Sequence, residues 1–383
     1  MSNDKLIALS LPNISGNEWK YVKDCLDTGW ISSVGAYVTQ FEKMVADFAG
    51  AGHGVAAVNG TAALHISLLL SGVKANDYVI LPNLTFVASA NSIKYLGADP
   101  LLIDADANLW QMDLDLLEQF LDEETDIRDG DLIYIKDGRR IGAIMPVHIL
   151  GNICDMDRFL SIVKKYPLPV VEDATEALGS TYNGRHAGTF SPLGCFSFNG
   201  NKIISTGGGG VIVTSDEELA KKAKHITTTA KASPDEYYHD EVGYNYRLVN
   251  ILAAVGVAQM EQLPGFIRRK KEIVKFYKEA FSDIEEIGFQ QELPGVVTNG
   301  WLFTIRSSRS EEILRHLNAN KILSRRFWMP MDRLPMYSGC PYISTKDEAG
   351  DIYNSCLSIP SSTNITDGDL EIVAREVKSV FKK

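Results

Sequence analysis

Alternating strand-like and helix-like segments between about residues 55 and 214 predict an α/β fold with a mostly parallel central sheet. Parallel strands are connected through helices and are covered on both faces, which gives short apolar runs separated by amphipathic segments. The 383 residues suffice for one large and one smaller domain. We place the large domain at residues 1–262 and a smaller C-terminal α+β domain at residues 263–383.

The first half of the chain supplies most of the alternation. Two N-terminal segments, residues 17–26 and 38–49, have helix-like apolar spacing. A strand at residues 55–58 is followed by a helix that runs to residue 70, by strands at residues 77–81, 100–103, 141–147 and 169–172, and by helices at residues 86–95 and 156–165. Residues 132–135, Asp137-Gly138 and the segment from Arg139 indicate a hairpin inserted before residue 141.

The second half closes the sheet and then changes pattern. Strands are expected at residues 195–198 and 211–214, followed by a charged helix at residues 216–224. Residues 249–260 form an apolar helix, which indicates an interior position or a subunit interface. A separate charged helix at residues 267–281 leads into the smaller domain, where we expect a strand at residues 300–305 and helices at residues 310–318 and 369–381.

Composition and charge exclude several classes of protein. A net charge of −11 argues against a nucleic-acid or anionic-membrane partner, because both need a basic surface. The first five residues show no signal-peptide pattern, and no apolar run is long enough to cross a bilayer. The five cysteines are odd in number and form no C-x-x-C pair, which predicts reduced thiols, no metal site and a cytoplasmic protein.

The most informative stretch surrounds Lys202. Residues 195–198 form a short apolar strand, Asn199-Gly200-Asn201 turns the chain, and four glycines follow at residues 207–210. A lysine fixed and desolvated in such a turn can be a neutral amine, the form that bonds to an aldehyde. The alternative is a surface lysine in a hairpin, and this stretch alone does not decide between the two.

Two further segments carry candidate ligands. Asn59, Gly60, Thr61 and Ala62 open a helix after a strand, where free amides can bind phosphate; the alternative is a simple N-cap by Asn59 or Thr61. Asp173 ends a buried strand, at the sheet edge where α/β proteins bind ligands. A buried carboxylate needs a cationic partner, which could be a protonated pyridine nitrogen or a structural arginine; an N-cap role is the third alternative.

Aromatic and cationic residues suggest a rim for the site. Trp30 lies between two glycines and is either a packed core residue or part of a ligand rim. Arg325, in a segment that continues to Trp328, is either part of a surface contact or a lip over an anionic substrate, and arginine suits phosphate through its forked geometry.

Together these features supply what a pyridoxal 5′-phosphate site needs: a lysine, a carboxylate for the ring nitrogen, a phosphate cradle and an aromatic such as Phe86 for the ring face. At these residues the sequence resembles the DegT/DnrJ/StrS family of sugar-nucleotide aminotransferases, over almost the whole chain. The resemblance is carried by Gly29-Trp30-Ile31-Ser32, Asn59-Gly60-Thr61-Ala62-Ala63-Leu64-His65, Pro82-Asn83-Leu84-Thr85-Phe86, Pro146-Val147-His148, Glu172-Asp173-Ala174, Phe196-Ser197-Phe198 with Lys202, and Gly243-Tyr244-Asn245-Tyr246-Arg247.

The resemblance implies a type I aminotransferase fold and a homodimer with shared active sites. It implies that Lys202 bonds to the cofactor and carries protons, and that Asp173 keeps the ring nitrogen protonated. It further implies cofactor-binding roles for Gly60, Thr61, Ala62, Phe86, Ser197, Asn245 from the partner subunit, and Arg247. Glu176 stands where many members have glutamine and would face the phenolic oxygen of the cofactor. A carboxylate there must either share a proton with that oxygen or be repelled by it.

For the substrate, the resemblance implies a nucleotide sugar and L-glutamate. Glu176 and the Asn199-Gly200-Asn201-Lys202 spelling are most similar to the branch that installs the 4-amino group of UDP-4-amino-4,6-dideoxy-N-acetylglucosamine for surface glycans. Met331, where many relatives have histidine, departs from the pattern of the sugar pocket. A 3-amino-sugar or other dTDP- or GDP-sugar aminotransferase is the alternative, and a regulator that only binds the cofactor would need a DNA-binding extension. The expected substrate-binding residues are Trp30, Ser32, His148, Arg325 and Trp328.

Overall fold

The computed structural model describes residues 5–233 and 235–382. Residues 1–4, on which most of the expected absence of a signal pattern rests, lie outside this part. The central sheet consists of two four-stranded sheets that join edge to edge through β-bridges from Ile144 to Val170 and from Val147 to Asp173. Its strand order is β1–β11–β10–β7–β6–β2–β3–β16.

These strands follow the predicted alternation, except β16, which comes from the C-terminal part of the chain and was not expected. They are β1 (His53–Ala57), β11 (Gly210–Thr214), β10 (Leu193–Ser197), β7 (Val171–Asp173), β6 (Ile141–Ile144), β2 (Tyr78–Pro82), β3 (Asp99–Ile103) and β16 (Tyr342–Ile343). Neighbours pair in parallel, except that β11 is antiparallel to both β1 and β10. The predicted α/β fold with a mostly parallel sheet is therefore confirmed.

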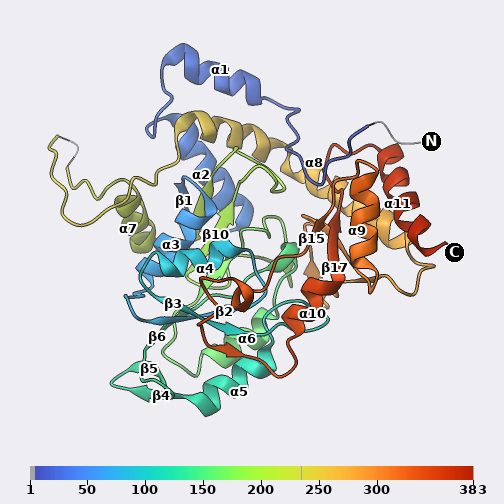
Figure 1. Cartoon of the computed structure of the whole chain (residues 1–383). Coiled ribbons are helices and arrows are strands. Elements are labelled where there is room, and N and C mark those ends of the chain that lie inside the picture. Colours follow the sequence, from blue (N-terminus) through green and yellow to red (C-terminus); the bar gives the residue numbers. More distant parts are fainter. Residues whose placement is uncertain (1–4, 234, 383) are drawn as a thin grey trace.

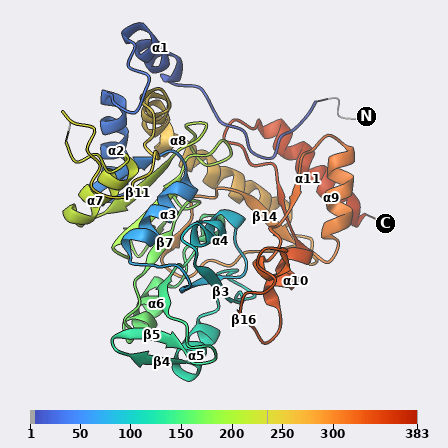
Figure 2. The same cartoon turned by 60° about the vertical axis from the view of Figure 1, so that its left-hand side comes forward.

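Helices cover both faces of the sheet (Figures 1 and 2). One hydrophobic core includes residues of α2 (Ala36–Ala49), α5 (Leu114–Glu124), α6 (Met156–Val163) and α8 (Asn250–Ala280). The second includes residues of α3 (Gly60–Leu70), α4 (Val87–Lys94), α7 (Glu217–Thr227) and α10 (Glu348–Ser355). Alternate residues of one strand enter different cores, as Val55 and Ala56 do, because successive side chains of a strand point to opposite faces.

A third core belongs to the C-terminal part of the chain. Its sheet has the order β12 (Gly288–Phe289), β14 (Phe303–Arg306), β17 (Cys356–Ile359) and β15 (Arg325–Arg326), all antiparallel, and it packs with α9 (Ser310–Ala319) and α11 (Asp367–Phe381). This agrees with the expected α+β character. Besides the hairpin described below, the structure has α1 (Glu18–Thr28), β8 (Thr181–Tyr182), β9 (Arg185–His186), β13 (Val296–Val297) and the 3-10 helices at Ile149–Gly151 and Met331–Arg333.

Two sequence predictions need correction. The helices expected at residues 249–260 and 267–281 are one continuous helix, α8, which contains Pro264. The expected domain division after residue 262 therefore falls inside a helix. The inserted hairpin is also larger than expected: β4 (Thr125–Arg128) pairs with β5 (Asp131–Tyr134), and β5 then turns back so that Ile133 bridges to Arg140.

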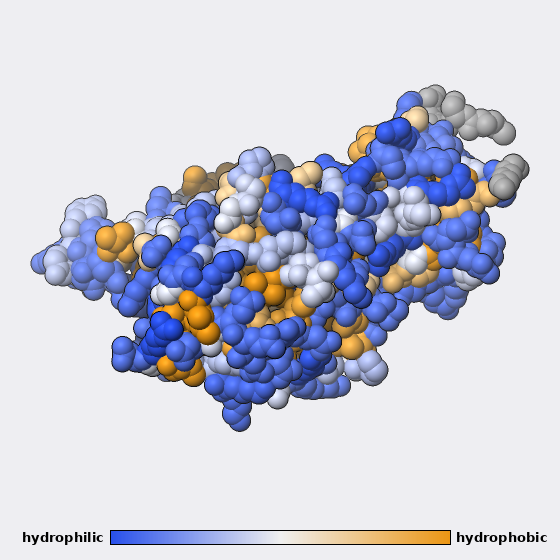
Figure 3. Space-filling model, turned by 60° about the horizontal axis from the view of Figure 1, so that its bottom comes forward, coloured by the Kyte–Doolittle hydropathy of each residue, from blue (hydrophilic) through white to orange (hydrophobic). Residues whose placement is uncertain are grey.

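The surface shown in Figure 3 is mostly hydrophilic, with apolar residues in several separate patches. Within residues 5–233 and 235–382, no helix combines the length and the hydrophobicity that a membrane span requires.

Candidate active site

A cavity of about 400 Å³ lies where the carboxyl ends of the parallel strands meet the C-terminal sheet. Open α/β sheets bind ligands at this edge. The cavity brings together ten of the residues singled out from the sequence or flanking them. Its lining includes Asn59, Gly60, Thr61, Phe86, Asp173, Glu176, Ser197, Lys202, Arg325 and Trp328.

Lys202 is the amine of this cavity. Its side chain is 11% exposed, and its Nζ lies 3.6 Å from Glu176 Oε1. The amide of Lys202 donates to the carbonyl of Asn199 at 3.0 Å, which closes the turn after β10. Burial lowers the pKa of Lys202, while Glu176 and Asp173 act in the opposite direction. The lysine is therefore a buried cavity residue and not a surface residue of a hairpin.

Asp173 presents its carboxylate at the end of β7. Oδ2 accepts a hydrogen bond from Ser89 Oγ at 2.6 Å, and Oδ1 accepts one from the Thr175 amide at 3.1 Å. The strand end is fixed as well, because the His148 amide donates to the Asp173 carbonyl. Among the described residues no arginine is paired with this carboxylate, so the predicted structural arginine is not observed. The hydrogen bond from the Thr175 amide resembles the predicted N-cap role.

Glu176 lies between the cavity and the backbone behind it. Oε2 accepts a hydrogen bond from the Leu150 amide at 2.9 Å, and Leu150 has a left-handed backbone with φ of 61°. Burial raises the pKa of Glu176 to about 7, with Lys202 acting against the shift. A carboxyl group with this pKa can hold or release a proton near neutral pH, so Glu176 is able to exchange a proton with a neighbouring group.

The start of α3 forms the opposite end of the cavity. The amides of the first helical residues have no partner within a helix, and here Asn59 Oδ1 accepts from the Ala62 amide at 2.8 Å. This N-cap is compatible with a phosphate site, because the amides of Gly60 and Thr61 precede the capped one. A Cβ on Gly60 would lie 2.8 Å from Ser197 Cβ, so only glycine allows this close approach of α3 to β10.

Aromatic rings enclose the remaining side. The Trp301 ring centroid lies 4.0 Å from Lys202 Nζ, and its ring stacks against Trp328 with centroids 6.4 Å apart. Phe86 is half exposed and meets Trp328 edge to face at 6.5 Å. Arg325 completes the rim from β15.

Sequence reasoning missed two residues that matter here. Trp301 was assigned only to a strand, and Ser89 only to the helix at residues 86–95. Neither carried a local signal, because a tryptophan before a strand and a serine in a helix are common in folded cores. Their contacts with Lys202 and Asp173 arise only when segments far apart in the sequence meet.

Several predicted residues lie away from the cavity lining. His148 is fully buried, with Nε2 3.0 Å from Glu172 Oε2, so the expected substrate contact does not fit its position. Arg247 is buried against Glu42 and the carbonyl of Ala56, which does not fit direct contact with a phosphate in this cavity. The side chain of Ala62 is buried behind Gly60 and Thr61.

The other predicted residues outside the lining are exposed. Asn245 lies on the outer surface beside Thr228, to which it forms a β-bridge. Trp30 is 58% exposed, so it is not a packed core residue. Asn250 holds this loop, because its side chain donates to the Trp30 carbonyl at 2.7 Å and its amide donates to the Ser32 carbonyl at 2.6 Å.

The chain belongs to the DegT/DnrJ/EryC1/StrS aminotransferase family, whose model it matches over residues 12–378. It is 36% identical, over the whole of both chains, to a GDP-perosamine synthase of Caulobacter vibrioides. It is 39% identical to a GDP-perosamine synthase of Escherichia coli O157:H7, over 87% of this chain and 88% of that one. The structure is similar to that of a putative sugar aminotransferase, Spr1654 from Streptococcus pneumoniae in its PMP form, with a TM-score of 0.88, 26% identity and 98% of each chain covered.

The cofactor is pyridoxal 5′-phosphate, and the cavity fits it. Lys202 offers an amine, Asp173 offers a carboxylate held by two hydrogen bonds, and the close approach of Gly60 to Ser197 shapes a cradle at a helix N-terminus. When bound, the cofactor supplies an aldehyde that a lysine can join and a ring that accepts electrons. The chain is thus a nucleotide-sugar aminotransferase, and its fold is that of the type I enzymes.

Proposed function

We propose that this enzyme transfers the amino group of L-glutamate to the C4 ketone of a GDP-linked 4-keto-6-deoxy sugar, for the synthesis of a surface polysaccharide. The observation that carries the proposal is the identity of 36% and 39% to two GDP-perosamine synthases, which extends over nearly the whole chain in both cases. The C4 ketone and the 6-deoxy group follow the expectation from the sequence, where the resemblance implies a 4-keto-6-deoxy sugar. The sequence alone favoured a UDP-linked N-acetylated sugar, and the relatives support the GDP-linked alternative better.

Lys202 is proposed to move the protons of both half-reactions. Its Nζ is buried, which lowers its pKa, and it lies beside the carboxyl group of Glu176, so the amine gives up a proton more readily than an exposed lysine does. Asp173 is proposed to hold a positive charge on the ring nitrogen, since its carboxylate keeps its orientation through Ser89 and Thr175. Together they account for a base and a counter-charge within one cavity.

The phosphate of the cofactor and the diphosphate of the sugar nucleotide are proposed to bind at different ends. The amides of Gly60 and Thr61 with the Ser197 hydroxyl suit a single phosphate at a helix N-terminus. Arg325 lies at the rim, where a guanidinium can pair with a diphosphate. Trp328, beside Arg325 in the lining, offers a flat face for the sugar.

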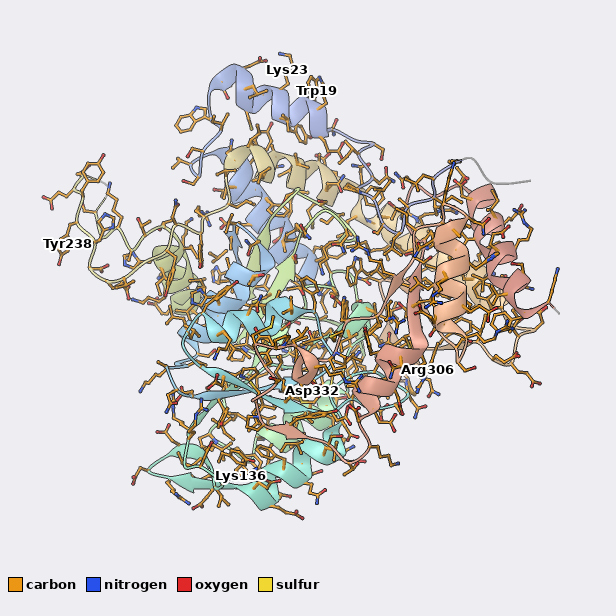
Figure 4. The ribbon with its side chains drawn as sticks, viewed as in Figure 1. Trp19, Lys23, Lys136, Tyr238, Arg306 and Asp332 are labelled. Carbon is orange, nitrogen blue, oxygen red and sulfur yellow. The ribbon has the colours of Figure 1, made fainter. Side chains whose placement is uncertain are left out.

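We also propose that the enzyme works as a homodimer. Within residues 229–233 and 235–246, the part around Tyr238 extends away from the body of the chain (Figure 4). Tyr237 is 96% exposed and Val242 83% exposed, which is unusual for large apolar side chains without a partner. In a dimer this segment would bring Asn245 to the phosphate end of the neighbouring site.

The substrate is tested by incubating the enzyme and L-glutamate with a matched panel of GDP-, UDP- and dTDP-linked 4-keto-6-deoxy sugars and a 3-keto sugar. Products are analysed by mass spectrometry. We expect the GDP sugar to gain an amine with the highest kcat/KM. Preference for the UDP-linked N-acetylated sugar would overturn the GDP assignment while preserving the enzyme class, and preference for a 3-keto sugar would overturn the position of amination.

The shared site is tested by mixing two inactive variants, Lys202→Ala and Asn245→Asp. If Asn245 serves the neighbouring site, mixed dimers contain one site that carries both changes and one intact site, so activity returns towards a quarter of the native value. If each chain forms its site alone, every site stays defective and mixing restores nothing. Exposed Lys271, replaced by methionine, serves as the control for the exchange procedure.

A further inference from the structure

Trp301 makes two contacts around Lys202, one with the backbone just before it and one with its amine. The indole Nε1 donates a hydrogen bond to the carbonyl of Asn201, the residue before Lys202, at 2.7 Å. The face of the same ring lies 4.0 Å from the Lys202 Nζ. The Trp301 side chain therefore holds the backbone of the turn and also contacts the amine end of the lysine.

Trp301 is itself held firmly. It is 2% exposed, its amide donates to Asn299 Oδ1 at 2.9 Å, and its carbonyl accepts from Lys270 Nζ at 2.7 Å. Lys270 is a buried residue of α8 that also donates to the carbonyl of Ser361, next to the C-terminal sheet. The indole is thus supported by the helix that runs through both parts of the chain.

The position of Nζ is informative because the described residues give it few alternatives. Glu176 Oε1 is 3.6 Å away, which is too long for a good hydrogen bond. Asp173 is oriented by Ser89 and Thr175 and acts on Lys202 only as a nearby charge. The ring of Trp301 is therefore the surface on which the amine lies, and an ammonium is attracted to the face of an indole.

We infer that Trp301 is a positioning residue for Lys202, an inference that rests on the role of Lys202 in the proposed function. Lys202 forms its bond to the cofactor aldehyde with loss of water, and it leaves as a free amine when the nitrogen of the amino donor takes its place. In the free state the amine rests on the face of the Trp301 ring. The hydrogen bond to Asn201 keeps the turn, and with it the starting point of the side chain, in place.

The test compares two cofactor forms on the purified full-length apoenzyme. Pyridoxal 5′-phosphate must bond to Lys202, whereas pyridoxamine 5′-phosphate carries an amine in place of the aldehyde and binds without that bond. We measure the rate at which visible absorbance develops with the first, and the dissociation constant of the second. The variants are Trp301→Leu, which removes the ring and the N–H, and Trp301→Phe, which keeps a ring face but loses the N–H.

We expect Trp301→Leu to slow bonding of pyridoxal 5′-phosphate by about tenfold and to leave the affinity for pyridoxamine 5′-phosphate within about twofold. Trp301→Phe should be slowed by less. Trp19, which is 77% exposed on the outer side of α1 (Figure 4), gives a matched tryptophan control, and Trp19→Phe should change neither value.

A general loss of pocket shape would lower binding of both cofactor forms alike, and this result would overturn the inference. An unchanged bonding rate in Trp301→Leu would overturn it as well. If Trp301→Leu does not fold, Trp301→Phe decides the question by the same two measurements. Neither readout depends on the sugar, so failure of the proposed GDP substrate leaves the test intact.

Discussion

Two buried lysines show what separates a reactive amine from a structural one. Burial lowers the pKa of both Lys202 and Lys270, that of Lys270 to about 7. Lys270 donates to two backbone carbonyls in a closed core, whereas Lys202 lies in a cavity beside Glu176 and a tryptophan ring. A lowered pKa alone therefore does not mark an active-site lysine; an accessible cavity and nearby acids are also needed.

Replacing Lys202 with alanine gives the largest expected effect and the sharpest contrast. Without the amine, the visible absorbance of the lysine-bound cofactor should be lost, and kcat should fall at least about 10³-fold. Absorbance spectra and turnover with glutamate measure this. Exposed Lys271 on the same helix as Lys270, changed to methionine, is the control. Turnover by Lys202→Ala close to the native rate would mean that Lys202, like Lys270, is not needed for catalysis.

Lys270 should reveal itself through stability. Its pKa is about 7 when folded and about 10.4 when unfolded, so between these values the unfolded chain binds the extra proton. The free energy of unfolding should therefore rise with pH in this window, by up to about 1.4 kcal/mol per pH unit from this group. Denaturant unfolding at pH 7 to 10 should show that Lys270→Met lacks this part of the slope.

If the native protein and Lys270→Met show the same slope, folding does not lower the pKa of Lys270, and the prediction is wrong. Lys271→Met again serves as control and should retain the native slope, because the Lys271 side chain is exposed and lies outside the buried core that holds Lys270.

Asp173→Asn tests an acid that acts on Lys202 and that has no counterpart among the groups acting on Lys270. An amide keeps the size of the carboxylate but not its charge, so it cannot stabilise a protonated ring nitrogen, and kcat should fall about a hundredfold. Ser89→Ala removes one hydrogen bond to the same carboxylate and should cost about fivefold. A larger loss from Ser89→Ala than from Asp173→Asn would show that position, and not charge, is what Asp173 contributes.

Gly60→Ala should have the smallest effect. The added Cβ would lie 2.8 Å from Ser197 Cβ, so α3 and β10 must separate, at a cost of about 1–2 kcal/mol in unfolding free energy. Affinity for pyridoxamine 5′-phosphate should fall in parallel. Gly368→Ala, where an added Cβ meets nothing within 4 Å, is the control. Equal melting temperatures and equal cofactor affinities for the two variants would show that the close approach of Gly60 to Ser197 is not needed for cofactor binding.

Much of this architecture could be predicted from the sequence. Strands such as β2 and β11 are uniformly apolar because both faces of the sheet are covered, and that pattern is local. The lysine turn and the carboxylate at the end of β7 were also visible, because turn residues and strand ends are local features. The parts that failed depend on contacts between distant segments.

Pro264 illustrates such a failure. It removes one helical hydrogen bond and suggests a break, but α8 packs along α1, α2 and α11, and these contacts stabilise the helix through the proline. His148 is another example, since it follows a strand in the same way as Asp173 and only the fold shows that it pairs with Glu172. Lys270 resembled the exposed lysines around it.

The most direct measurement asks which lysine bonds to the cofactor. The enzyme is loaded with pyridoxal 5′-phosphate, reduced with borohydride so that the carbon–nitrogen bond becomes permanent, digested, and mapped by mass spectrometry. We expect the added mass on the peptide that contains Lys202, and we expect Lys202→Ala to lose it. Stoichiometric label on Lys270 or any other lysine, or label retained in Lys202→Ala, would contradict this expectation.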